Sequence, residues 1–127
     1  MKKIITTKDA PAPIGPYSHA VMVGNMLFVS GQVCKHPETG ELMTGDIKTE
    51  THQVMKNIQA ILSEAGLTFA HVVKTTIFLT DFNDFAAVNE VYGSYLLSGG
   101  YPARETVQVS KLPLGVNVEI SVIAIND

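Results

Sequence analysis

Short runs of alternating apolar and polar residues recur along the chain, and this period of two is typical of β-strands with one buried face. Two such runs, 19–23 and 26–30, are separated only by Gly24-Asn25, a pair that favours the tight turn of a β-hairpin. Gly31 is expected to end the second strand. The same pattern, with many β-branched residues, predicts four further strands, at 2–6, 69–79, 102–109 and 116–125.

The period becomes helical after Asp46, and the apolar positions then follow one face of a predicted helix that ends before Gly66. This face consists of Ile47, Thr51, Val54, Ile58, Ile61, Leu62 and Ala65. The polar residues expected to lie off this stripe are Lys48, Glu50, Lys56 and Gln59. An amphipathic helix of this kind is expected to pack on a sheet.

A second helix is predicted to begin after Asp81 or Asn83, because either residue is a suitable N-terminal cap. Its apolar face consists of Phe85, Val88, Tyr92 and either Tyr95 or Leu96. The helix is expected to end at Ser98-Gly99-Gly100.

Together these elements predict one α+β domain over residues 1–127, with a six-stranded sheet and both helices on the same face. The other face of the sheet then remains uncovered and apolar, and a second copy of the chain is the simplest partner for it. Only 17% of the residues are charged, against about 25% in ordinary soluble domains. This shortage favours a permanent protein–protein interface. The alternative is a surface rich in Ser, Thr, Asn and Gly.

Charge and composition exclude several classes of protein. A net charge of −3 does not suit a protein that binds a phosphate backbone. No apolar run approaches the roughly 20 residues that span a bilayer, and residues 1–5 lack the apolar core of a signal peptide. Cys34 is the single cysteine and cannot form an internal disulfide, so a cytoplasmic protein is expected. The four histidines have no metal-ligand spacing, and no metal site is expected.

The last two strands carry an arginine and a glutamate among apolar residues. Alternation places Arg104 and Thr106 on one face of their strand and Glu105 on the other, while Glu119 lies opposite the apolar residues of the last strand. Buried without partners, such charges cost free energy. They form either an Arg–Glu pair or solvated edge residues, or they bind a substrate carboxylate beside a carboxylate that moves a proton. Periodicity alone leaves these alternatives open.

The sequence resembles the Rid family, also called the YjgF family, along nearly its whole length. The matching segments are Ala12-Pro13-Ile14-Gly15-Pro16-Tyr17-Ser18-His19-Ala20, Phe28-Val29-Ser30-Gly31-Gln32, 57–67, 73–85, Asn89-Glu90-Val91-Tyr92, Tyr101-Pro102-Ala103-Arg104, Lys111-Leu112-Pro113 and Val118-Glu119-Ile120. The sequence is most similar to the RidA branch, whose members are reactive imine and enamine deaminases.

The resemblance implies a chorismate-mutase-like fold, with one mixed six-stranded sheet, and a homotrimer whose sheets form a central barrel with active-site clefts between subunits. By position, Arg104 would hold the substrate carboxylate and Glu119 would activate the attacking water. Further residues implied to line the cleft are Tyr17, Ser30, Gly31 and Asn89.

The implied reaction is hydrolysis of 2-iminobutanoate or 2-iminopropanoate to the 2-oxo acid and ammonia, without a cofactor. Glu105 and Thr106 stand where family members commonly have Ser or Cys, and the loop 97–100 is shorter. Thr106 is expected to offer a hydroxyl to the substrate in place of a thiol, while Glu105 points away from the cleft. The alternatives are a non-catalytic trimer that binds small carboxylates, and an endoribonuclease or translation inhibitor. The acidic charge balance argues against the last.

Overall fold

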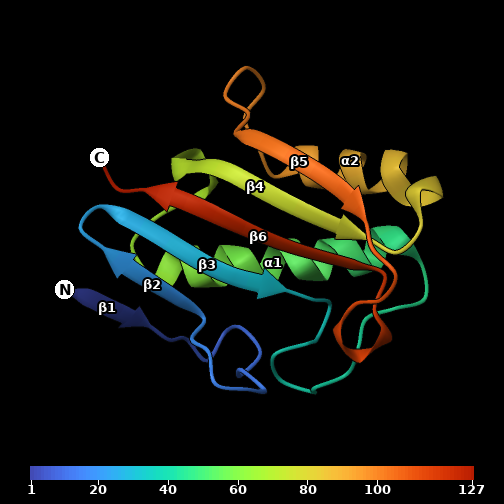
Figure 1. Ribbon diagram of the computed structural model, residues 1–127, viewed down its shortest axis with the longest axis horizontal. Coiled ribbons are helices and arrows are strands. Elements are labelled where there is room, and N and C mark those ends of the chain that lie inside the picture. Colours follow the sequence, from blue (N-terminus) through green and yellow to red (C-terminus); the bar gives the residue numbers. More distant parts are fainter.

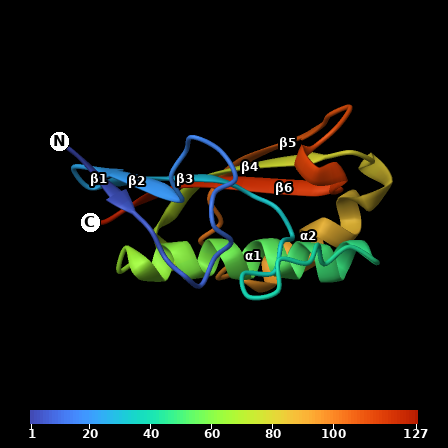
Figure 2. The same ribbon diagram turned by 90° about the horizontal axis from the view of Figure 1, so that it is seen from below.

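The computed structural model describes residues 1–127 as one mixed sheet with two α-helices on one face (Figures 1 and 2). The strands are β1 (Lys2–Ile5), β2 (Ala20–Val23), β3 (Met26–Gln32), β4 (Val72–Leu79), β5 (Ala103–Gln108) and β6 (Val118–Ile125). The helices are α1 (Ile47–Glu64) and α2 (Phe85–Ser94), with short 3-10 turns η1 (Phe69–His71), η2 (Phe82–Asp84) and η3 (Pro113–Gly115). The strand order is β1-β2-β3-β6-β4-β5, in which only β4 and β5 are parallel neighbours. The predicted α+β class and six-stranded mixed sheet are confirmed.

Helix α1 begins and ends as the sequence predicts. The Asp46 side chain accepts hydrogen bonds from the backbone N–H groups of Lys48 and Thr49, two of the donors left free at a helix start. Gly66 follows the helix with a φ of +76°, a conformation that suits glycine. One prediction for this helix is wrong: Glu50 is completely buried.

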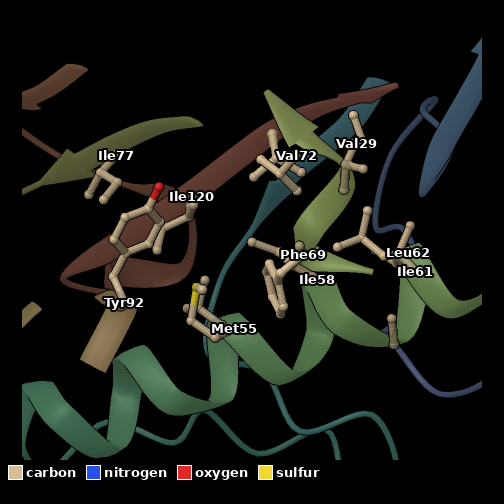
Figure 3. Close-up of a cluster of buried hydrophobic side chains, with 14 of the residues drawn as sticks. Val29, Met55, Ile58, Ile61, Leu62, Phe69, Val72, Ile77, Tyr92 and Ile120 are labelled. Carbon is tan, nitrogen blue, oxygen red and sulfur yellow. The ribbon is translucent and has the colours of Figure 1, made fainter. Parts of the chain in front are cut away.

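The core lies between α1 and the covered face of the sheet. Figure 3 shows Met55, Ile58, Ile61 and Leu62 of α1 directed at side chains of the strands, among them Val29, Val72, Ile77 and Ile120. Helix α2 adds Tyr92, whose hydroxyl donates a hydrogen bond to Oγ1 of Thr75 at 2.9 Å. This contact fixes α2 to β4, and β4 is the neighbour of both β5 and β6.

Several boundaries in the second half differ from the prediction: β6 starts at Val118 rather than 116, and β5 is one residue shorter at each end than the predicted 102–109. Strand β4 starts at Val72 rather than 69, because Thr68 and His71 form a capping box that starts η1. Helix α2 ends at Ser94, before the predicted glycines. Its first turn has Asp84 as the cap without a side-chain hydrogen bond, while Asp81 caps η2.

The sheet face away from the helices is uncovered, as predicted. Its alternating positions expose large apolar side chains between 37% and 48%, namely Ile4, Val23, Met26, Phe28 and Val107. Glu105 points to this face, where Lys74 lies 3.2 Å away and Thr76 donates a hydrogen bond to it. Neither helix has the length and apolar character needed to cross a membrane.

Candidate active site in two halves

A cavity of about 340 Å³ lies around the carboxylate of Glu119, and we call it the Glu119 cavity. It is lined by Ile14, Tyr17, Ser30, Gly31, Val33, Pro113, Leu114 and Glu119. Four of the sequence-predicted residues, Tyr17, Ser30, Gly31 and Glu119, therefore come together. Figure 2 shows η3 and part of the segment between β1 and β2 on the side of the sheet opposite the helices.

Gly31 lets Glu119 occupy its position. A Cβ atom at residue 31 would lie 2.5 Å from Oε2 and 2.8 Å from Cδ of Glu119. Gly31 does not end the strand as expected: β3 continues to Gln32, and its register with β6 shifts between Val29 and Gln32. Such an irregularity redirects side chains next to a site.

Burial raises the pKa of the Glu119 carboxyl above its ordinary value. Apolar surroundings disfavour the charged form of a carboxyl group. Glu119 is thus a carboxyl able both to accept and to return a proton closer to neutral pH than an exposed glutamate.

The Tyr17–Ser18 segment is fixed on one side of this cavity by polar contacts. Ser30 Oγ donates to the carbonyl of Ser18 at 2.5 Å, and the Tyr17 hydroxyl accepts from the N–H of Ile14 at 3.3 Å. His19 is buried, with Nδ1 accepting from the Thr7 N–H and Nε2 at 2.7 Å from the Pro11 carbonyl oxygen. The histidine thus holds the proline-rich loop over the cavity, a structural role.

Another part of the cavity wall is η3, with Leu114 in a left-handed conformation (φ 61°). A non-glycine residue in this region costs about 1 kcal/mol or more, and such strain gathers at functional sites. The sequence prediction did not include Leu114. The only available signal was the Pro113-Leu114-Gly115 turn directly before the strand that carries Glu119.

A second cavity, of about 300 Å³, surrounds the guanidinium of Arg104, and we call it the Arg104 cavity. It is lined by Asn89, Tyr92, Gly93, Tyr101, Pro102 and Arg104. Arg104 Nη1 donates to Oδ1 of Asn89 at 2.7 Å, and the guanidinium carbon lies 5.3 Å from the Tyr92 ring centroid and 5.7 Å from that of Phe85. The planar group is held at one nitrogen and against aromatic rings, which leaves other N–H groups for a ligand.

The two cavities are on opposite faces of the sheet in one chain. Arg104 is in register with Thr75, whose hydroxyl contacts α2 on the covered face. Glu119 is in register with Phe78 and alternates with the core residues Val118 and Ile120, so it faces the uncovered side. The Arg104–Glu119 pair that alternation left open is therefore not formed within a chain.

Thr106 lies on the covered side, in register with the buried Ile77. It does not line the Arg104 cavity, and its Oγ1 is buried without a hydrogen-bond partner. A buried hydroxyl in this state carries a free energy cost of about 1–3 kcal/mol. Glu105 points to the opposite face, as expected.

The fold and the two half-sites define an α+β protein with a half-covered sheet and a charged group on each side of it. The chain matches the family described as "Endoribonuclease L-PSP" over residues 7–126. It is 48% identical to a 2-iminobutanoate/2-iminopropanoate deaminase of Mus musculus, over 98% of this chain and 92% of that one.

Two solved structures extend the comparison. The RidA protein of an Antarctic Psychrobacter species has a TM-score of 0.93 with 47% identity, over 98% of this chain and 99% of that one. Escherichia coli TdcF, solved with bound serine, has a TM-score of 0.94 with 42% identity, over 98% and 99% of the two chains. The chain belongs to the Rid family and is similar to its RidA members.

Proposed function

We propose that this protein is a hydrolytic deaminase of reactive 2-imino acids, such as 2-iminobutanoate and 2-iminopropanoate, which it converts to 2-oxo acids and ammonia. The observation that carries the proposal is the Glu119 carboxyl, with a raised pKa, inside a mainly apolar cavity beside Tyr17 and Ser30. A relative that is 48% identical bears the name of this activity.

We propose further that the complete site forms between two copies of the chain in a homotrimer. Arg104 and Glu119 face opposite sides of one sheet, so a single chain carries both half-sites but does not bring them together. The exposed apolar side chains of the uncovered face, Phe28 among them, support assembly through this face.

In this mechanism Arg104 of one copy binds the carboxylate of the substrate through its guanidinium fork, which matches a carboxylate in geometry and charge. Asn89 holds the guanidinium in place. These contacts fix the imine carbon over Glu119 of the neighbouring copy.

The hydrolysis then needs one water and one proton shuttle. Ionised Glu119 takes a proton from water as the water oxygen bonds to the imine carbon, the C=N electron pair moves to the nitrogen, and Glu119 passes this proton to the nitrogen to give the carbinolamine. Glu119 then takes the hydroxyl proton of the carbinolamine as the carbonyl forms and delivers it to the nitrogen, so the C–N bond breaks with its electron pair on the leaving ammonia. The products are the 2-oxo acid and ammonia, so Glu119 ends in its starting state.

The test is the rate at which the imine decays to the 2-oxo acid and ammonia, with a dehydratase supplying the imine. Wild type should accelerate decay over buffer, and Glu119→Gln should lower kcat by roughly 100-fold. Arg104→Ala should act mainly on KM, raising it at least about tenfold because it removes a charge-assisted pair. No acceleration by the folded wild-type protein would refute the proposal.

A second candidate, a non-catalytic trimer that binds small carboxylates, has one specific observation in its favour. The related TdcF was solved with bound serine, a small carboxylate. Calorimetry with 2-oxobutyrate distinguishes the two: binding that depends on Arg104, without any acceleration of imine decay, would favour this candidate.

The matched family description also names an endoribonuclease. The chain's net charge of −3 gives no support for a surface that binds an RNA backbone. RNA cleavage that persists through repurification and disappears in Arg104→Ala would be needed to support an endoribonuclease function.

A further inference from the structure

Glu50 is a completely buried carboxylate that takes no part in the mechanism above. It projects from the first turn of α1 toward the segment that leads into β6. Its Oε2 accepts from the backbone N–H of Asn117 at 2.6 Å and from that of Val118 at 3.0 Å, and its Oε1 accepts from Nδ2 of Asn117 at 2.9 Å. Hydrogen bonds from these three N–H donors offset the free energy cost of burying a carboxylate that has no cation beside it.

All three donors belong to the two residues directly before Glu119. Asn117 is also held from β4, because its carbonyl accepts from the Thr80 N–H at 3.1 Å and its Oδ1 accepts from the Thr80 hydroxyl at 3.4 Å. The start of β6 is thus fixed between α1 and β4. The strained η3 turn, with Leu114 at φ 61°, lies immediately before this anchored point.

The Glu119 side chain receives no hydrogen bond from the rest of the chain. Its carboxylate is located by the path of β6 and by its close packing on Gly31, where even a methyl group has no room. A small displacement of residues 117 and 118 therefore moves the Glu119 carboxylate directly. A reacting group displaced by about 1 Å loses up to roughly 100-fold in rate.

We propose that Glu50 is a positioning residue for Glu119: its buried carboxylate fixes Asn117 and Val118 and so places the Glu119 carboxylate against Gly31 in the cavity. The inference rests on the proposed function for its kinetic consequence, but the placement of Glu119 can be measured without activity. Glu50 would act through the backbone and would not touch the substrate.

The test compares Glu50→Gln with Val54→Ala. Glutamine keeps the shape of the side chain but turns one acceptor oxygen into a donor NH₂ group, which faces an N–H donor of residues 117 and 118. Val54 lies one turn further along the same helix and is also fully buried, so Val54→Ala lowers stability while it leaves in place the Glu50 carboxylate that binds Asn117 and Val118. A third variant, Asn117→Ala, removes one of the three donors and should have a smaller effect of the same kind.

The first readout is kinetic. Glu50→Gln should lower kcat for imine hydrolysis by about tenfold or more, with KM and 2-oxobutyrate binding within twofold of wild type. Val54→Ala, assayed well below its melting temperature, should keep wild-type kcat. Equal losses of kcat in the two variants, or none in Glu50→Gln, would overturn the inference.

The second readout is the nuclear Overhauser effect between the γ-protons of Glu119 and the α-protons of Gly31 in wild type and both variants. It should weaken in Glu50→Gln and persist in Val54→Ala. If wild type proves inactive, the proposed function fails and this measurement alone decides: an unchanged signal in folded Glu50→Gln refutes the positioning role, and a selective loss supports it.

Discussion

Gly31 and Glu119 define the tightest requirement at the scale of single residues. Gly31→Ala would bring Cβ within 2.5 Å of Oε2 of Glu119, so the carboxylate must move. We expect imine hydrolysis to fall by more than about tenfold, with only a small loss in the free energy of unfolding, because the atoms displaced belong to a flexible side chain that borders a cavity. The rate of imine decay and urea unfolding measure the two effects.

The matched control is Gly100→Ala. A Cβ atom at Gly100 would meet only the Leu97 carbonyl oxygen, at an ordinary 3.7 Å. This variant should keep both the rate and the stability of wild type within about twofold and 0.5 kcal/mol. Wild-type activity in Gly31→Ala would contradict the placement of Glu119.

The raised pKa of Glu119 predicts a pH-dependent stability. The folded state raises the pKa of this carboxyl above its ordinary value of 4.5, so the folded protein binds the proton more tightly than the unfolded chain does. The contribution to stability is therefore favourable at low pH and is lost as pH rises through the folded pKa. We expect Glu119→Gln to be more stable than wild type at neutral pH, with the difference shrinking toward about pH 4.

Urea unfolding at fixed protein concentration across this range measures the effect, since assembly also contributes to stability. The same carboxyl should limit activity: kcat should fall as pH drops through its pKa, because the ionised form accepts the proton from water. Glu119→Gln being less stable than wild type at neutral pH would show that the ionised carboxylate has a stabilising partner.

Sequence alternation predicted these residues only in part. It placed Arg104 and Thr106 on one face and Glu105 on the other correctly, because alternation within a strand is a local property. It could not relate Arg104 to Glu119, because their strands are separated in the sheet by β4, which comes earlier in the chain. The family resemblance supplied the cleft residues. The pairing of β4 with β5 and with β6 shows that one chain places these residues in two separate cavities.

Glu50 was missed for a different reason. Its charge placed it outside the apolar stripe of α1, although Glu50, Val54, Asn57 and Ile61 follow the spacing of one helix face and are all buried. The partners that make its burial possible are backbone N–H groups 67 and 68 positions away along the chain. No local pattern contains that information.

The ends of the elements show which local signals determine a helix. Asp46 accepts two backbone hydrogen bonds at the start of α1 and a third from the Thr49 hydroxyl. The Thr49 hydroxyl, and after it the backbone N–H groups, lower the pKa of the Asp46 carboxyl. Asp84 occupies the same position at α2 without any such bond. Residue type alone does not distinguish them, which is why the start of α1 was predicted well and the cap of α2 was not.

This contrast gives a prediction for the two helices. Asp46→Ala should lower Tm by about 5 °C, because two N–H groups lose their acceptor. Asp84→Ala should leave Tm within about 1 °C of wild type. Differential scanning calorimetry of both variants measures the two Tm values. Equal Tm shifts would show that the Asp46 hydrogen bonds do not stabilise the protein.

The largest scale is that of the assembly, where the uncovered sheet face and the divided site have a single explanation. The apolar residues of this face, including Met26 and Phe28, remain exposed in one chain, and so do the two half-sites. If three chains pack through their sheets, the same step buries the face and joins Arg104 of one copy to Glu119 of the next. Burial and catalysis would then depend on one interface.

Mixing two impaired variants, assayed at a substrate concentration well below KM, tests this directly. Arg104→Ala lacks the carboxylate clamp and Glu119→Gln lacks the proton shuttle, but a cleft shared between copies can take Arg104 from one variant and Glu119 from the other. Random assembly of coexpressed, differently tagged chains in equal amounts should restore about a quarter of the wild-type rate, since each functional residue is present in half of the chains. The double variant Arg104→Ala/Glu119→Gln, coexpressed with wild type, is the matched control: it leaves about the same fraction of intact clefts. Recovery in that control but none in the mixture would mean that each site is built from one chain.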